Sequence, residues 1–343
     1  MQIDGRPIGG GRPPYVIAEL SNNHLGDPKR ACRLIEIAAE CGANAVKIQT
    51  YDAEALTIDC DRPEFIIKTP PWVGLNYYQL YRRIALPAEF TELLFRVARD
   101  CGITIFSSAF DERAVELLRR LNCPAYKIAS FEICDDPLLR AVGATGRPVI
   151  VSTGIAGLDD IEEAIRVLRG AGCQDVALLH CISQYPANTA EMHLSVIDRL
   201  AQLNCVVGLS DHSLDNFAAV LAVARGAALI EKHFTISRED GGPDASFSLE
   251  PAELAALVKD VKRAWEAIGD PGLLERATRA GSEHGRSLFV VESMRAGDTF
   301  GPQNVRAIRP GCGLPPRTIV RILGRRARRD LARGEPLHWE DVE

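Results

Sequence analysis

The sequence predicts a (β/α)₈ barrel followed by a small C-terminal module. From residue 15 to about residue 269, short apolar and β-branched runs alternate with segments of helical periodicity. The apolar runs are continuous, which is typical of parallel strands that are covered on both faces. Eight such units in roughly 250 residues match the size of a closed barrel. An open, doubly wound sheet is the alternative, but no glycine-rich dinucleotide loop follows the first run.

Each predicted strand is followed by a helical pattern. In 161–168 and again in 254–261, apolar residues recur at the i, i+3, i+4, i+7 spacing of a helix face. Glycines such as Gly42 and Gly102 follow several of these helices and indicate left-handed C-caps. The predicted strands are Tyr15–Leu20, Ala45–Thr50, Ile103–Phe110, Ala125–Ser130, Pro148–Thr153, Val176–Cys181, Val206–His212 and Leu229–Thr235.

One connection is much longer than the others. It runs from Thr50 to a helix that begins near Pro87, and its segment Trp72–Tyr81 is rich in aromatic residues. Connections of this length inside a compact domain are usually functional or disordered, and the aromatic content argues against disorder. We therefore expect it to pack over the mouth of the barrel or at a subunit contact.

The pattern changes after Gly269. We predict a barrel domain over residues 1–269, a polar linker over 270–283 and a compact module over 284–343. The segments 295–305 and 332–342 repeat one pattern of glycine, acid, apolar residue and final valine, so the module is expected to be pseudo-symmetric. Its arginine cluster, between Arg321 and Arg329, is interpreted as a solvated or interface face.

Composition excludes several classes of protein. The chain has 343 residues and a formal net charge of -6, which gives no support to nucleic-acid binding. The N-terminus lacks the apolar core of a signal peptide, and no apolar run is long enough to span a bilayer. The ten cysteines are scattered without a Cys-x-x-Cys pair, which indicates reduced thiols. The expected location is the cytoplasm.

Two histidines lie near the ends of consecutive strands. His212 follows Gly208–Asp211, and His233 follows Glu231 and Lys232. One strand–helix unit separates them, so a barrel would place them side by side at its catalytic rim. Imidazole is a common ligand of divalent transition metals, and two imidazoles leave coordination positions for a substrate. Either histidine alone would be read as ordinary packing, but the pair, with carboxylates next to it, predicts a metal site.

Two lysines, Lys47 and Lys127, lie within predicted strands. Burial of an unpaired ammonium is costly, so these lysines are not neutral packing residues. Hydroxyls at neighbouring strand ends, including Ser108 and Ser130, predict a doubly cationic pocket for a small dianion such as a phosphate or carboxylate. A lysine that forms a Schiff base is the rival interpretation, and it leaves the histidine pair unexplained. A metal beside a phosphate site suits carbon–carbon bond formation with a phosphorylated three-carbon partner.

At these residues the chain resembles the sialic acid synthase family. The resemblance covers nearly the whole chain, and its C-terminal part is similar to the antifreeze-like (SAF) domain that these enzymes carry. The motifs are Ile17-Ala18-Glu19-Leu20-Ser21 with Asn23-His24, Val46-Lys47-Ile48-Gln49-Thr50-Tyr51, Tyr126-Lys127-Ile128-Ala129-Ser130, Ser152-Thr153-Gly154, Gly208-Leu209-Ser210-Asp211-His212, Glu231-Lys232-His233-Phe234-Thr235 and, in the SAF part, Arg306-Ala307-Ile308-Arg309-Pro310-Gly311-Cys312-Gly313.

Within the family, the pseudaminate branch is the most similar. Residues 241–251, Trp72-x-Gly74 and Ser183 resemble that branch. This implies condensation of phosphoenolpyruvate with 2,4-diacetamido-2,4,6-trideoxy-L-altrose to a nine-carbon acid. Ser108-Ala109 replaces the usual Thr-Pro, which keeps the hydroxyl but leaves the local turn open to change.

The resemblance also implies roles for single residues. Mn²⁺, with Co²⁺ or Mg²⁺ as alternatives, would bind His212 and His233, and the catalytic set is Glu19, His212, Glu231 and His233. Glu19 or the metal would steer water, and Glu231 or Asp244 would orient the metal or the sugar hydroxyls. Phosphoenolpyruvate would bind Lys47, Ser108, Lys127, Ser130, Ser152, Ser183 and Ser210. The amino-sugar would bind Tyr185, Asp244, Phe247 and Arg309, the last from the partner in a domain-swapped homodimer.

Other functions stay open at this point. A neuraminate or legionaminate synthase would use the same fold and chemistry. A metal-dependent barrel hydrolase would use the histidines but has no need of two strand lysines. A sugar-binding protein built on the SAF module would tolerate loss of His212.

Overall fold

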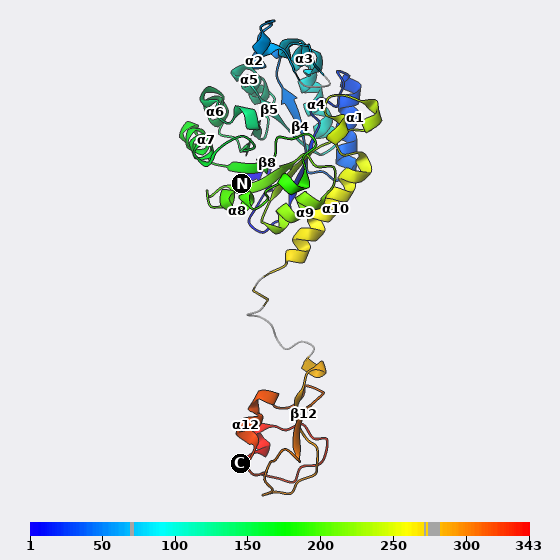
Figure 1. Cartoon of the computed structure of the whole chain (residues 1–343), viewed down its shortest axis with the longest axis vertical. Helices are drawn as coiled ribbons and strands as arrows, with labels where there is room; N and C mark the ends of the chain where they lie inside the picture. Colours follow the sequence, from blue (N-terminus) through cyan, green and yellow to red (C-terminus); the bar gives the residue numbers. More distant parts are fainter. Residues whose placement is uncertain (69–71, 271, 274–281) are drawn as a thin grey trace. The chain divides into compact units, whose positions relative to one another are not determined.

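The structure is a computed structural model that describes residues 1–68, 72–270, 272–273 and 282–343. The chain divides into two compact units, Met1–Gly269 and Asp270–Glu343 (Figure 1). Most of the predicted linker over 270–283 lies outside the described residues.

The first unit is the predicted barrel. Within the described residues, its parallel strands close in the order β10-β3-β4-β5-β6-β7-β8-β9. A short hairpin of β1 (Gln2–Ile3) and β2 (Arg6–Pro7) precedes them. The barrel strands are β3 (Tyr15–Glu19), β4 (Ala45–Thr50), β5 (Thr104–Ala109), β6 (Tyr126–Ile128), β7 (Val149–Ser152), β8 (Val176–Cys181), β9 (Val206–Asp211) and β10 (Leu229–His233). All eight predicted strands are thus confirmed, with ends that differ by a few residues.

Helices surround the strands because each presents one apolar face. In α1, for example, Leu34, Ile35 and Ala38 are buried, and Asp27 caps the helix by accepting from the Lys29 amide. Strands covered in this way have both faces buried, which explains their continuous apolar sequences. The helices that follow the strands are α1 (Pro28–Glu40), α4 (Ala88–Asp100), α5 (Glu112–Arg120), α6 (Asp136–Gly143), α7 (Leu158–Ala171), α8 (Val196–Ala201), α9 (Phe217–Ala224) and α10 (Pro251–Ile268).

Strand register brings the functional side chains to one level. His233 of β10 pairs with Glu19 of β3, and Glu19 pairs with Lys47 of β4. On the next pair of strands, Ser108 of β5 is opposite Lys127 of β6. These positions lie toward the carboxyl ends of the strands, where barrels of this class carry out chemistry.

The long connection packs over the mouth of the barrel. It contains α2 (Ala53–Leu56) and α3 (Tyr77–Ile84), and Asn76 begins α3 with a reciprocal capping box to Gln79. Leu56 and Tyr81 line the cavity at the strand ends, as predicted. Residues 69–71 lie outside the described part of the chain.

The C-terminal unit has its own core. Strand β11 (Ser287–Val290) pairs antiparallel with β12 (Val305–Ile308), and the short α12 (Ile319–Ile322) packs Ile322 into the centre. The two predicted sequence repeats form similar turns in the structure. Asp298 accepts from the Arg295 amide in one copy, and Glu335 accepts from the Ala332 amide in the other.

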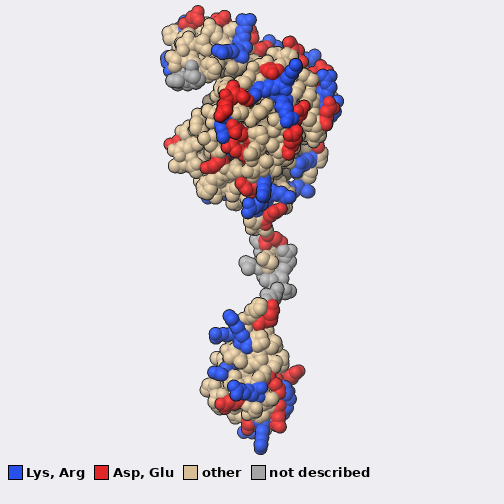
Figure 2. All heavy atoms as spheres, turned by 90° about the vertical axis from the view of Figure 1, so that its right-hand side faces the viewer, with Lys and Arg blue, Asp and Glu red and all other residues tan. Residues whose placement is uncertain are grey.

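The arginine cluster of this unit lies on its surface. Arg329 pairs with Glu335 and Asp341, each at 2.9 Å, and Arg321 stacks over Trp339 at 4.7 Å. Figure 2 shows basic and acidic side chains interspersed on this unit and on the face of the barrel unit in view. The cluster is therefore partly neutralised by its neighbours. Among the described residues, no helix has the length and apolar character needed to cross a membrane.

Candidate active site

A cavity of about 250 Å³ opens at the carboxyl ends of the barrel strands. It brings together residues that are far apart in the sequence, because each strand contributes one or two side chains at its end. Of the residues predicted to act at the site, those that line the cavity are Glu19, Lys47, Lys127, Ser130, Ser152, Tyr185, Ser210, His212, Glu231, His233 and Asp244.

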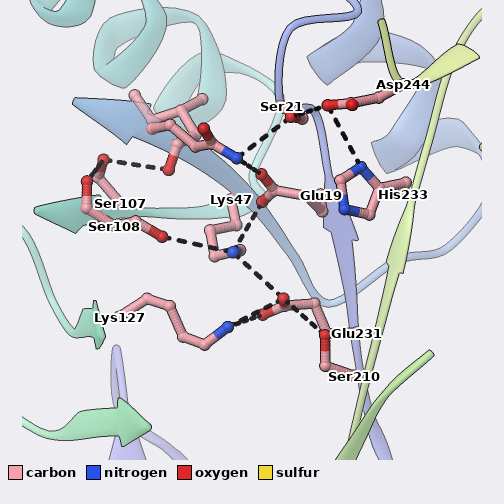
Figure 3. A network of polar contacts seen from close by, with 12 residues as sticks. Glu19, Ser21, Lys47, Ser107, Ser108, Lys127, Ser210, Glu231, His233 and Asp244 are labelled. Carbon is pink, nitrogen blue, oxygen red and sulfur yellow. Dashed lines mark hydrogen bonds and ion pairs between the residues drawn. The ribbon is translucent and has the colours of Figure 1, made fainter. Parts of the chain in front are cut away.

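The floor of the cavity is a cluster of buried charges (Figure 3). The Lys47 Nζ lies 3.1 Å from Glu19 Oε2 and 3.1 Å from Glu231 Oε1. The Lys127 Nζ lies 3.0 and 3.2 Å from the two oxygens of Glu231. Ser210 donates to Glu231 at 3.2 Å, and Lys47 donates to Ser108 at 3.4 Å.

This arrangement corrects one expectation. The sequence predicted a doubly cationic pocket, but the Glu231 carboxyl joins the two ammonium groups, and the Glu19 carboxyl pairs with the Lys47 ammonium. Buried ammonium groups need nearby counter-charges, and Glu231 reaches both lysines from the opposite strand. The carboxyl of Glu231 thus contacts the lysines in the structure, and not a histidine.

The two carboxyl groups differ in pKa. Burial acts to raise the pKa of Glu231, but Lys127 and Lys47 hold it well below its ordinary value. At Glu19, burial dominates over the charge of Lys47 and raises the pKa. Burial likewise lowers the pKa of Lys127. Glu231 therefore stays ionised, whereas Glu19 is the group poised to take up a proton.

The two predicted histidines lie together, with ring centroids 5.4 Å apart. Burial lowers the pKa of each to about 4, so both rings are neutral at pH 7. The Nδ1 of His212 is 3.0 Å from the carbonyl oxygen of Ile182. Since a carbonyl only accepts, that nitrogen carries the proton and the lone pair is on Nε2. The Nδ1 of His233 is 3.8 Å from Asp244 Oδ2.

The histidine pair suits a divalent metal that shares its coordination with a substrate. Two neutral imidazoles with free lone pairs are appropriate ligands. Among the described residues, however, no group of three or more His, Cys, Asp or Glu side chains is arranged to hold a metal ion. An ion at this position would therefore need substrate or water oxygens to complete its coordination.

Hydroxyl groups line the side of the cavity formed by β6, β7 and β8. Ser130 accepts from the Gly154 amide at 3.2 Å and lies 3.0 Å from the sulfur of Cys181. The buried hydroxyls of Ser152 and Ser183 have no hydrogen-bond partner among the described residues. Buried polar groups are normally paired, so these two are candidate ligand contacts.

Gly154 makes the approach of these groups possible. A Cβ at this position would lie 2.6 Å from the Ser183 oxygen, 2.7 Å from the Cys181 sulfur and 2.9 Å from the Ser130 oxygen. Only glycine leaves this space open.

Aromatic rings cover the histidines. Tyr185 lies 4.5 Å from His212, and Phe247 lies 4.9 Å from His233, in each case between ring centroids. Tyr185 and Phe247 also contact each other at 5.1 Å. They form an apolar wall beside the predicted metal position.

Four predicted residues do not line the cavity. Ser108 contacts Lys47, the Ser183 hydroxyl lies next to Gly154, and Phe247 packs on the histidines. Arg309 is exposed in the C-terminal unit, directly after β12. The single chain does not test its predicted contact with a partner's sugar.

Sequence reasoning gave no role to several residues that line the cavity. Tyr51 and Tyr81 come from the two ends of the long connection, and its aromatic content was the available signal. Glu132 follows β6, and burial raises its pKa to about 7. Its buried Oε2 has no hydrogen-bond partner in the described part of the chain. Burial of this carboxylate was not readable from the sequence.

The comparisons with known proteins agree with this geometry. The NeuB family model matches residues 34–272, and the SAF domain model matches residues 285–343. The pseudaminic acid synthase of Helicobacter pylori is 36% identical over 97% of this chain and 98% of its own length. That of Campylobacter jejuni is 38% identical over 96% of each chain.

Relatives with other substrates are also similar. The N,N'-diacetyllegionaminic acid synthase of Legionella pneumophila is 33% identical over 100% of this chain and 98% of its own length. The crystal structure of an N-acetylneuraminic acid synthetase from Leptospira borgpetersenii superposes with a TM-score of 0.72. It is 32% identical and covers 80% of this chain and 94% of that chain.

Proposed function

The chain belongs to the NeuB family, and from this premise we propose that it condenses phosphoenolpyruvate with 2,4-diacetamido-2,4,6-trideoxy-L-altrose to form pseudaminic acid. The observation that carries the chemistry is one cavity region that holds two buried lysines, hydroxyls without a hydrogen-bond partner among the described residues, and two neutral histidines. The choice of sugar is supported by the two pseudaminic acid synthases, which are 36% and 38% identical, against 33% for the legionaminic acid synthase.

Phosphoenolpyruvate carries two anionic groups, a phosphate and a carboxylate, one for each of the two lysines. In the proposed complex, Lys47 and Lys127 donate to these groups and partly exchange Glu231 for the ligand. Neighbouring hydroxyls complete the contacts. They belong to Ser108, Ser130, Ser152, Ser183 and Ser210.

The reaction joins the enol carbon of phosphoenolpyruvate to the aldehyde carbon of the sugar. Water then adds to the cationic carbon that carries the phosphate, and phosphate leaves by cleavage of its C–O bond. Glu19 takes the proton of that water, because burial raises its pKa above the ordinary value of a carboxyl group and makes it a stronger base. A divalent ion on His212 and His233, Mn²⁺ with Co²⁺ or Mg²⁺ as alternatives, would polarise the aldehyde as a Lewis acid.

The sugar would lie against the aromatic wall. Tyr185 presents apolar surface to the cavity that is suited to methyl and acetyl groups, with the buried ring of Phe247 packed behind it, and Asp244 accepts from a hydroxyl or amide. We extend the proposal to a cytoplasmic, domain-swapped homodimer in which Arg309 reaches the partner's sugar. The exposure of Arg309 and its place in the SAF domain support this role.

We expect the doubly acetamidated trideoxy sugar to be preferred over N-acetylmannosamine. Apolar contacts discriminate by about 1–3 kcal/mol per group, which corresponds to roughly tenfold to a hundredfold in kcat/KM with some cross-reactivity. The measurement is phosphate release from phosphoenolpyruvate with a panel of hexosamine-derived sugars. Equal or higher kcat/KM for N-acetylmannosamine would move the substrate to the neuraminate branch. Turnover without phosphoenolpyruvate would instead favour a hydrolase.

The lysines are expected to act through charge and not through a Schiff base. Lys47 is kept protonated by Glu19 and Glu231, which raise its pKa against the effect of burial. Burial lowers the pKa of Lys127, but its ammonium is held by both oxygens of Glu231, whose pKa lies well below its ordinary value. An amine needs to be neutral to attack a carbonyl. Borohydride added during turnover should therefore trap no adduct. A substrate-dependent mass increase on Lys47 or Lys127 after reduction would contradict this prediction.

A further inference from the structure

Ser21, the second residue after β3, has a backbone conformation that residues other than glycine rarely adopt. Its φ is 43°, in the left-handed region, and its residue exposure is only 4%. Glycine adopts this conformation without the strain that a Cβ introduces. A serine at such a position suggests that its side chain has a task, since strained residues concentrate at functional sites.

The hydroxyl of Ser21 lies in the middle of a directed chain of hydrogen bonds (Figure 3). It donates to Asp244 Oδ2 in a short contact and accepts from Gln49 Nε2 at 3.1 Å. The hydroxyl has one hydrogen, and a carboxylate only accepts, so the direction is fixed. The same amide nitrogen of Gln49 donates its second hydrogen to Glu19 at 2.9 Å.

Asp244 in turn faces His233. Its Oδ2 is 3.8 Å from the His233 Nδ1, a buried nitrogen that makes no hydrogen bond within the described residues. A carboxylate next to an imidazole nitrogen favours the tautomer with hydrogen on that nitrogen, because a lone pair there would be repelled. The lone pair of His233 is then on Nε2.

The loop that contains Ser21 is already anchored to the barrel by Asn23, so Ser21 is not needed for that purpose. The fully buried Asn23 donates to the carbonyl oxygen of Phe234 and to the Ser248 hydroxyl, each at 2.8 Å. These bonds tie the loop after β3 to the loop after β10. The bond from Ser21 instead ends on the side chain of Asp244, within the cavity.

We propose that Ser21 is a positioning residue whose hydroxyl holds the Asp244 carboxylate against His233 and so determines which ring nitrogen of His233 carries hydrogen. The kinetic consequence rests on the proposed function, whereas the effect on the histidine ring does not. Because the φ of Ser21 is one that glycine adopts without strain, glycine removes the hydroxyl and leaves the backbone conformation in place.

The test compares Ser21→Gly with the wild-type protein. Glycine relieves the backbone, which offsets the added entropy of the unfolded chain and the loss of the bonds to Asp244 and Gln49, so the Tm should stay close to the wild-type value. Nitrogen NMR of histidine-labelled protein in chelator should show Nδ1–H on His233 in the wild type and a mixture of tautomers in the variant. The His233 signals are identified by their loss in His233→Gln. We expect kcat/KM for the sugar to fall about tenfold, with KM for phosphoenolpyruvate changed less than twofold.

Ser107→Ala is the matched control. Ser107 is equally buried, its hydroxyl is 2.7 Å from that of Thr50, and it does not line the cavity. This variant should lower the Tm without changing the His233 signals. The double variant Ser21→Gly with Asp244→Asn should show the same His233 tautomer mixture as Asp244→Asn alone, because both substitutions act through one contact.

Wild-type His233 signals in Ser21→Gly would overturn the proposal. A loss of kcat/KM that merely follows a lower Tm would overturn it as well. If the wild-type protein turns over no sugar with phosphoenolpyruvate, the proposed function fails, and the NMR comparison still decides the role of Ser21.

Discussion

Replacing Lys127 with methionine should lower kcat/KM for phosphoenolpyruvate by about a thousandfold. Loss of one preorganised donor to a developing or bound anion commonly costs a hundredfold to a thousandfold, and Lys127 is a full charge in a buried site. The variant also leaves Glu231 with Lys47 and Ser210 as its remaining partners. Breaking a buried ion pair costs about 3–5 kcal/mol of stability, so the Tm will fall too.

Lys232→Met separates these two effects. Lys232 is as buried as Lys127 and pairs with Asp211 at 2.8 Å, but it does not line the cavity. We expect a comparable fall in Tm with KM for phosphoenolpyruvate close to the wild-type value. Equal losses of kcat/KM in both lysine variants, measured by phosphate release, would mean that the Lys127 effect is one of stability alone.

Replacing either His212 or His233 with alanine should lower kcat by about a thousandfold or more. Each substitution removes one of two imidazoles, and the described residues offer no third protein ligand to retain the ion. The wild-type enzyme should lose activity in chelator and regain it with Mn²⁺ or Co²⁺. Binding of Mn²⁺, measured by electron paramagnetic resonance without substrates, should be lost in both variants.

His180→Ala is the control for this prediction. His180 is buried at the end of β8, and its Nε2 lies 2.7 Å from the carbonyl oxygen of Met192, outside the cavity lining. It should lower stability and leave Mn²⁺ binding intact. Full activity in His212→Ala and in His233→Ala would refute the metal site.

The barrel was predictable because each of its strands and helices leaves a pattern in its own stretch of sequence. Strands covered on both faces require continuous apolar runs, and those runs alone located all eight strands. The histidine pair followed from topology, since consecutive strands of a barrel are neighbours. Neither inference required knowledge of the distances between side chains.

The partners of the lysines were not predictable in the same way. Glu231 and Lys127 are separated by 104 positions, and their strands, β10 and β6, are not neighbours in the barrel. Only the closed geometry brings these side chains together across the interior. The left-handed backbone of Ser21 was likewise invisible, because serine at that place gives no signal in composition or periodicity.

The shared carboxylate of Glu231 makes anion binding an exchange. A small anion that enters the cavity competes with a group already held by both ammonium groups, so its net affinity is the difference between two similar interactions. Single-charge ions such as chloride gain little from this exchange. A ligand with two anionic groups gains more, since it engages both lysines at once. In the proposed reaction, cleavage of the C–O bond separates the phosphate from the carboxylate, and each anion would then compete with Glu231 alone. The internal carboxylate would therefore favour binding of intact phosphoenolpyruvate over retention of the released phosphate.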